Sequence, residues 1–308
     1  MSLSQLQNSL CHTTRWKTSE TLCASVLLCL FELFAGTTTP ENYFHHAQGI
    51  GTLIEARGPR HDLWSPFDIT LIQASRSTLI AASIFGAGRC RLTNKEWRSF
   101  FRAHPPDSLP EDLHAFYEDF YDLLSEMPSI AHKGQARLRA FASSSYVEPA
   151  EDESLLAHTI AVHQRWNAWN QQFIAKFPAP VEVPSPRGDD RFPTVYMYDD
   201  AWRAAAQITY NSCLIIMNLV FALVGYGGDR SAEVSGSVDR ICKSVEMASQ
   251  GMFGPNRVGF GLRIAYEAAS PEIRLWIEGW LKEFDRSYAA TNHKGYPTTT
   301  AADILGRG

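Results

Sequence analysis

Two adjoining segments near the N-terminus decide the fold of this chain. They read SETLCASVLLCLFELFAG over residues 19–36 and TTTPENYFHHAQGIGTLIEARGP over residues 37–59. The first is apolar almost all round at helical spacing, which is typical of a central buried helix, here ending at Gly36. After a Thr/Pro loop, Glu41 to Arg57 predicts a second helix that Gly58-Pro59 stops. We therefore expect a helix pair around which the rest of the chain packs.

Helical patterns continue beyond this pair. Apolar residues recur with the period of a helix, and prolines or glycines stand at the ends of most of these segments. No run of alternating strands and no fixed-period repeat occurs, so the predicted class is all-α, a multi-helix globular bundle. The predicted helices span residues 66–85, 111–127, 151–177, 199–224, 231–249, 257–269 and 271–288.

Two glycines lie inside the second helix of the pair. Gly49 and Gly51 weaken a helix unless a neighbouring element packs against their bare backbone. The pattern predicts a close crossing of two helices at this point.

The domain organisation is read from composition. Residues 1–17 are a polar N-terminal lead, and residues 18–308 predict one helical body. The segment 178–193 holds five prolines among sixteen residues, which excludes a helix and indicates an extended connector between two helical halves.

Charge and apolar content exclude some classes of protein. The chain has 308 residues, a net charge of -5 and no basic run, so direct binding to nucleic acid is not expected. The apolar run 22–34 is short for a membrane span and is flanked or interrupted by Glu20 and Glu32. Neither secretion nor membrane insertion is expected.

The six cysteines form no C-x2-C pair, which is the usual half of a zinc site. Four of them lie in apolar helical segments, where cysteine commonly packs as a small hydrophobe. Reduced, structural thiols in an intracellular compartment are the interpretation.

Candidate chemistry in the opening pair rests on Glu32, His45 and His46. A histidine near a buried glutamate could serve acid–base chemistry or bind a metal. The plainer interpretation is a solvent-facing glutamate and a histidine that hydrogen-bonds across the helix pair. We favour the plainer one, because no third group stands at a fixed spacing.

Two aspartate pairs, Asp189-Asp190 and Asp199-Asp200, invite comparison with the magnesium-binding motif of class I terpene cyclases. The first pair lies in the proline-rich connector. The second has no acid three residues on and suits an ordinary helix N-cap. Terpene cyclisation is therefore not expected.

Three parts of the opening pair resemble a known family. These are residues 31–34 (FELF), 43–50 (YFHHAQGI) and 53–59 (LIEARGP). They resemble the Tyr/Phe-Glu-x-Phe, Trp-x-x-His-x-x-Gly-Ala and Leu-Ile-x-x-Arg-Gly-Pro hallmarks of the regulatory domain of fungal zinc-cluster (Zn2Cys6) transcription factors, the fungal-specific transcription factor type. Tyr43 stands where the family usually has tryptophan, and Ile50 where it has a small residue.

The resemblance extends more loosely over most of the chain. Arg76 and Trp97 fall where the family has an arginine on the next helix and a tryptophan after it. The proline-rich connector, the aliphatic helix 211–224 and residues 271–276 (PEIRLW) are similar to the family's later half.

The chain departs from the family in one respect. The zinc-cluster module needs two C-x2-C-x6-C halves with basic residues between them, and the six cysteines here are not so arranged. Either the sequence lacks an N-terminal module, or the protein is a stand-alone descendant; its start at Met1 favours the second explanation.

The resemblance implies a regulator. It would bind a small apolar effector, with sterols as one implied class, or a partner protein, and form a homodimer or a heterodimer with a transcription factor. It would act on a fungal secondary-metabolite pathway from the nucleus or cytoplasm, without contacting DNA or a membrane.

The alternative is an enzyme or carrier that kept the same scaffold. Its candidate residues are Glu32, His46, Arg57, Tyr198 and Asp199. Isomerisation, cyclisation or dehydration in an apolar pocket would need only one acid–base pair. Neither interpretation implies a metal or another cofactor.

Overall fold

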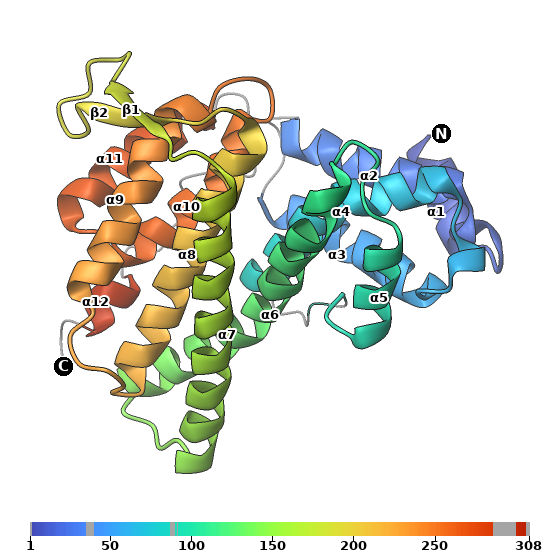
Figure 1. The fold of residues 1–308 in the computed structure, drawn as a ribbon. Helices are drawn as coiled ribbons and strands as arrows, with labels where there is room; N and C mark the ends of the chain where they lie inside the picture. Colours follow the sequence, from blue (N-terminus) through green and yellow to red (C-terminus); the bar gives the residue numbers. More distant parts are fainter. Residues whose placement is uncertain (1, 35–39, 87–89, 91, 286–299, 306–308) are drawn as a thin grey trace. The chain divides into compact units, whose positions relative to one another are not determined.

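The computed structural model describes residues 2–34, 40–86, 90, 92–285 and 300–305. Within these residues, twelve α-helices and one two-stranded sheet confirm the predicted all-α class (Figure 1). The helices are α1 (Leu3–Cys11), α2 (Ser19–Phe34), α3 (Pro40–Arg57), α4 (Pro66–Phe85), α5 (Lys95–Ala103), α6 (Glu111–Ala142), α7 (Pro149–Lys176), α8 (Ala201–Leu223), α9 (Ser231–Ala248), α10 (Gly254–Ala268), α11 (Pro271–Phe284) and α12 (Ala301–Leu305).

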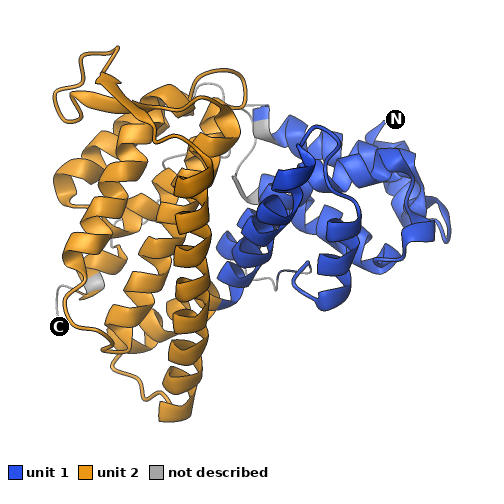
Figure 2. Ribbon diagram, in the orientation of Figure 1, with its two compact units in different colours: residues 1–129 blue, residues 130–308 orange. Residues whose placement is uncertain are grey.

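The chain forms two compact units, residues 1–129 and 130–308 (Figure 2). Helix α6 begins in the first unit and ends in the second. The proline-rich segment 178–193 lies inside the second unit.

The opening helix pair is present in the first unit. Helices α2 and α3 pack on each other, and both contact α4. The predicted end of the first helix at Gly36 lies outside the described residues. Helix α4 matches its predicted bounds, because Ser65 forms a capping box with Asp68 at its start. Part of the polar lead forms a helix as well, α1, which also begins with a capping box. Buried apolar side chains of this core are Leu22, Ile50, Ile54, Ile72, Leu79 and Ile80.

The prediction of close packing at Gly49 is wrong. A Cβ added at Gly49 would meet no atom within 4 Å. Close approaches occur at other glycines, among them two in the second unit that the sequence analysis did not single out. A Cβ at Gly134 would lie 2.7 Å from Val220, and one at Gly261 would lie 2.3 Å from Ile208.

Helix α6 does not end at Met127 as predicted. It continues through Pro128 to Ala142 as one helix of 32 residues. Proline removes one backbone hydrogen bond from a helix. The apolar stripe nevertheless continues across it, with Met127 and Ile130 both completely buried. Burial of this stripe outweighs the local disfavour of one proline.

Helix α8 is central to the second unit and contacts α7, α9, α10 and α12. Asp200 caps its first turn by accepting a hydrogen bond from the backbone N–H of Arg203. By length and composition alone α8 could cross a membrane, but 78% of its most apolar 18-residue window is buried inside the protein. The core helix of a folded domain meets the same criteria.

The proline-rich segment contains one unpredicted strand, and a second unpredicted strand follows directly after it. Strand β1 (Val181–Pro184) pairs antiparallel with β2 (Thr194–Met197), and Val181 lies opposite Met197. The loop between them is held on α9 and α11. The carboxylate of Glu246 accepts hydrogen bonds from the Ser185 hydroxyl at 2.6 Å and from the Arg187 backbone at 2.8 Å.

Candidate functional site

The five candidate residues from the sequence belong to different units. Glu32, His46 and Arg57 lie in the first, and Tyr198 and Asp199 in the second. Each group is therefore described within its own unit.

The structure brings Glu32 and His46 together. Nε2 of His46 lies 3.5 Å from Oε1 of Glu32, with side chains 36% and 16% exposed. On the same two helices, the Cys29 thiol contacts the carbonyl of Tyr43, and burial, with the charge of Glu32 adding to it, raises the pKa of Cys29 to about 12. The contact joins α2 to α3. Among the described residues, no group of three or more His, Cys, Asp or Glu side chains is placed to hold a metal.

Replacing Glu32 or His46 with glutamine is expected to change the free energy of unfolding by less than about 1 kcal/mol, because a partly exposed ion pair contributes little. Urea unfolding followed by circular dichroism at neutral pH measures the change. A loss above about 2 kcal/mol in either variant would show that the pair holds the two helices together.

Arg57 is a structural residue at the meeting point of three helix ends. Its Nε donates to the carbonyl of Leu63 at 2.8 Å, and its Nη2 donates to the same carbonyl and to Oδ2 of Asp68 at 2.9 Å. Its guanidinium also stacks over the Trp64 ring, 4.1 Å from the centroid. These contacts fix the chain where α3 ends and α4 begins.

Asp68 is the centre of this junction, and the sequence analysis missed it. Its Oδ2 also accepts hydrogen bonds from the hydroxyls of Ser65 and Ser19, at 2.9 and 3.0 Å, and the side chain is 0% exposed. Burial raises the pKa of Asp68, but the hydrogen bonds from Arg57, Ser65 and Ser19 outweigh burial and hold it below its usual range. The capping-box pattern over residues 65–68 was the available signal. We call Arg57, Asp68, Ser65 and Ser19 the helix-end junction.

Arg76 forms a second buried pair, with Glu118 on α6. The two side chains are 4% and 2% exposed, and Nη1 of Arg76 donates to Oε1 of Glu118 at 2.8 Å. The guanidinium lies between the rings of Phe101 and Tyr121, at 3.9 and 4.2 Å from their centroids. Arg76 thus links α4, α5 and α6 inside the first unit.

In the second unit, Tyr198 and Asp199 make local contacts. The Tyr198 hydroxyl lies 2.9 Å from that of Ser244. Burial raises the pKa of Tyr198 to about 12, although the bond to Ser244 opposes the rise, so the phenol keeps its proton at neutral pH. Asp199 pairs with Arg203 at 2.6 Å. The phenol can donate a hydrogen bond but cannot act as a base at neutral pH.

Three of the four aspartates in the two aspartate pairs make contacts that stabilise the fold. Asp199 is held by Arg203, and Asp200 is the N-cap of α8, as the plainer interpretation predicted. Asp189 accepts hydrogen bonds from the indole N–H of Trp276 at 2.6 Å and from the backbone of Arg191. These carboxylates are engaged in loop and cap structure, so they do not form a shared cation site as they stand.

All six cysteines are free thiols. Burial raises the pKa of Cys213 and Cys242 in the second unit above the ordinary thiol range. These thiols are packed, unreactive side chains, as predicted.

The chain is similar to proteins of one known family. The family model described as "fungal specific transcription factor domain" matches residues 1–298. The "uncharacterized protein AN5342" of Emericella nidulans is 31% identical over 83 residues, which are 27% of this chain and 17% of that protein. The chain thus covers less than two thirds of the length of this relative. No solved structure significantly matches the chain. The family match over residues 1–298 shows that the chain belongs to the fungal specific transcription factor domain family.

Proposed function

We propose that this protein regulates transcription by binding an effector or a partner protein, without contacting DNA through the residues present here. The observation that carries the proposal is the family match over residues 1–298. The net charge of -5 also supports it, since a protein that grips the phosphate backbone usually presents a basic surface. On this proposal the protein works in the nucleus or cytoplasm, in regulation of a fungal secondary-metabolite pathway.

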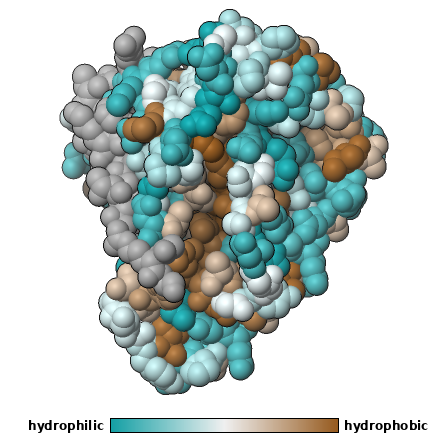
Figure 3. Space-filling view, turned by 90° about the vertical axis from the view of Figure 1, so that its left-hand side faces the viewer, coloured by the Kyte–Doolittle hydropathy of each residue, from teal (hydrophilic) through white to brown (hydrophobic). Residues whose placement is uncertain are grey.

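The family's hallmark residues support a regulatory scaffold. Arg57 and Arg76, two arginines of the family pattern, are used in buried contacts of the first unit. They maintain the fold and leave other surfaces for recognition. On one face of the second unit, apolar residues gather in a band between polar areas (Figure 3). Such a band suits an apolar effector or a partner protein, as a homodimer or as a heterodimer with a transcription factor.

One observation favours the second candidate function, an enzyme. Glu32 and His46 lie 3.5 Å apart, which is the kind of pair that proton transfer requires. A strain carrying Glu32→Gln and His46→Gln together tests it, because the fold should survive both changes.

The proposal is tested by transcript and metabolite profiles of a deletion strain. We expect a set of genes, neighbouring genes among them, to change expression several-fold, and the double glutamine variant to restore wild-type transcripts. Unchanged transcripts with one accumulating intermediate would overturn the regulatory proposal. In that case, failure of the double glutamine variant to clear the intermediate would support the enzyme.

A further inference from the structure

A seam of polar side chains runs along three helices of the second unit. On α7 and α9 the residues recur at spacings of three and four, which places them on one helix face, and on α8 the adjacent pair Tyr210 and Asn211 widens the face toward both neighbours. Helix α8 lies against both α7 and α9, so its polar face contacts both neighbours. The seam consists of His163, Asn167 and Asn170 on α7, of Gln207, Tyr210, Asn211 and Asn218 on α8, and of Glu233, Ser237 and Arg240 on α9, with Arg230 at the start of α9.

Hydrogen bonds cross this polar seam at several points along the helices, and one histidine lies near a carboxylate. Amide and phenol groups join α7 to α8, while two arginines join α9 to α8. These contacts show that the side chains point toward one another. The contacts are Tyr210 Oη to Asn167 Oδ1 at 2.9 Å, Gln207 Nε2 to Asn170 Oδ1 at 3.1 Å, Arg240 Nε to Asn211 Oδ1 at 2.9 Å, Arg230 Nη1 to Asn218 Oδ1 at 3.0 Å, and His163 Nε2 to Glu233 Oε1 at 3.9 Å.

Three buried atoms in the polar seam have no hydrogen-bond partner among the described residues. They are Nδ2 of Asn218, Oγ of Ser237 and Nε of Arg230. Asn218 and Ser237 are 1% and 0% exposed. Buried polar groups are nearly always paired, so three in one seam need an explanation. Each of the three can donate a hydrogen bond, and two can only donate. The complementary group is therefore a hydrogen-bond acceptor.

The charges favour an anionic acceptor. Arg230 pairs with Glu233 at 3.0 Å, but that carboxylate is 40% exposed and the pair is a weak surface one. Arg240 lies one level further along α9 and has no carboxylate partner within the described part of the chain. Among the residues of the polar seam there are thus two arginines and one partly exposed carboxylate, so positive charge is in excess.

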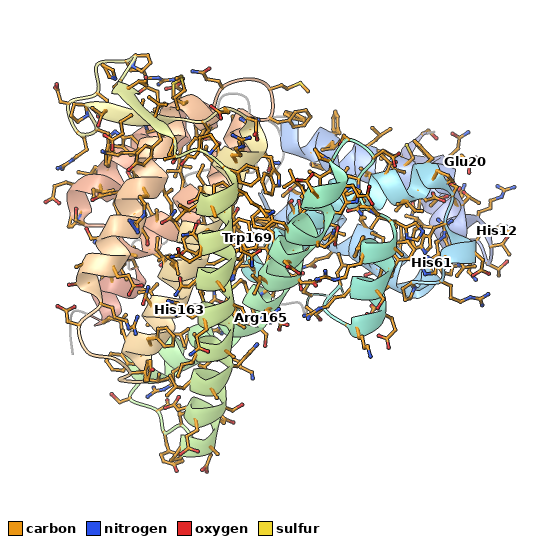
Figure 4. The ribbon with its side chains drawn as sticks, in the orientation of Figure 1. His12, Glu20, His61, His163, Arg165 and Trp169 are labelled. Carbon is orange, nitrogen blue, oxygen red and sulfur yellow. The ribbon has the colours of Figure 1, made fainter. Side chains whose placement is uncertain are left out.

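Access from solvent is on the α9 side, where Arg240 and Glu233 are exposed. On α7, His163 and Arg165 leave the helix on opposite sides (Figure 4). His163 is half-buried in the polar seam, and burial, with Arg230 adding to it and Glu233 opposing, lowers its pKa. Arg165 is exposed and belongs to the other face of the helix. It serves below as a matched control.

We propose that the polar seam binds the oxyanion of a small molecule, a carboxylate or a phosphate, through Asn218, Ser237 and Arg230, with Arg240 attracting it. This inference rests on the proposed function, because the bound molecule is then the effector. A molecule with an apolar body can carry such a group at one end.

The test uses the full chain and two probes, inorganic phosphate and citrate, in isothermal titration at low ionic strength. Saturable binding of at least one probe is expected, and the stronger one identifies the headgroup. Ser237→Ala and Arg240→Gln should each weaken binding about tenfold or more, as loss of a hydrogen bond or charge to an anion does. Arg165→Gln, which removes the same charge from the other face of α7, should bind as the wild type does.

A second measurement separates a binding role from a structural one. Ser237→Ala removes a hydroxyl that has no hydrogen-bond partner among the described residues, so its unfolding midpoint in urea should equal or exceed that of the wild type while binding weakens. No saturable binding of either probe, or equal weakening in Arg165→Gln, would overturn the inference. If the deletion strain still shows altered transcripts, the proposed function stands without it. Binding of a probe with unchanged transcripts would instead remove the regulatory proposal.

Discussion

An Asp68→Ala variant is expected to lose about 3–5 kcal/mol of unfolding free energy, among the largest effects of any single substitution in the first unit. Asp68 is completely buried and accepts hydrogen bonds from Arg57, Ser19 and Ser65. Without the carboxylate, the guanidinium of Arg57 remains largely buried and loses its counter-charge. Urea unfolding followed by tryptophan fluorescence measures the loss, since Trp64 stacks on Arg57.

The matched control is Asp62→Ala. Asp62 pairs with Arg60 at 2.6 Å, but both side chains are more than half exposed, so the change should be far smaller than that of Asp68→Ala. If Asp68→Ala lost no more than Asp62→Ala, the helix-end junction would not hold the unit together.

The contribution of Asp68 to the free energy of unfolding depends on pH in the acid range. The folded-state pKa of Asp68 lies below its unfolded value of about 3.9. The unfolded chain therefore binds more protons as the pH falls, and stability from Asp68 is present above about pH 4 and lost as the pH falls through the folded pKa. Asp68→Asn should remove this part of the acid dependence.

A second large effect is expected at the buried pair of Arg76 and Glu118. Arg76→Met leaves Glu118 as an uncompensated buried charge and should cost about 3–5 kcal/mol. The double variant Arg76→Met, Glu118→Leu removes both charges from a site lined by Phe101 and Tyr121. It should recover most of the loss, because apolar replacements of a buried pair are often neutral. A double-mutant cycle by urea unfolding measures the coupling.

Arg102→Ala is the control for this cycle. Arg102 pairs with Asp119 and Asp122 nearby, but its side chain is 42% exposed. It should lose far less than Arg76→Met does. A double variant as unstable as Arg76→Met alone would show that the arginine packs mainly between the two rings and that its charge pairing is secondary.

Much of the fold could be predicted from local patterns. Helix α4 has its predicted bounds, because the helical pattern of apolar residues begins directly after the capping residue Ser65. Other predicted helix ends were wrong where contacts with residues far along the chain determine the end of the helix. Pro128 would end an isolated helix, yet the buried stripe carries α6 past it. Gly49 suggested a close approach of a second helix, but no atom of the described residues lies within 4 Å of a Cβ added there.

The candidate site was predictable only in part. Glu32 and His46 do meet, because facing helices of a pair bring such residues together. The partner of Arg76, however, lies 42 positions further along the chain. Spacing in one sequence cannot identify such a contact, since the loops between helices leave the pairing open. The polar seam was missed for the same reason, as its members come from three helices.

The helix-end junction has a consequence for how relatives of this chain are recognised. Because Arg57 pairs with the carboxylate of Asp68, a substitution that removes this carboxylate leaves a largely buried cation without its counter-charge. The Arg-Gly-Pro signature and the acidic residue eleven positions later should therefore be inherited together. A sequence search that requires both features would collect proteins of one fold, whatever each of them regulates. It would group these proteins by fold and not by function.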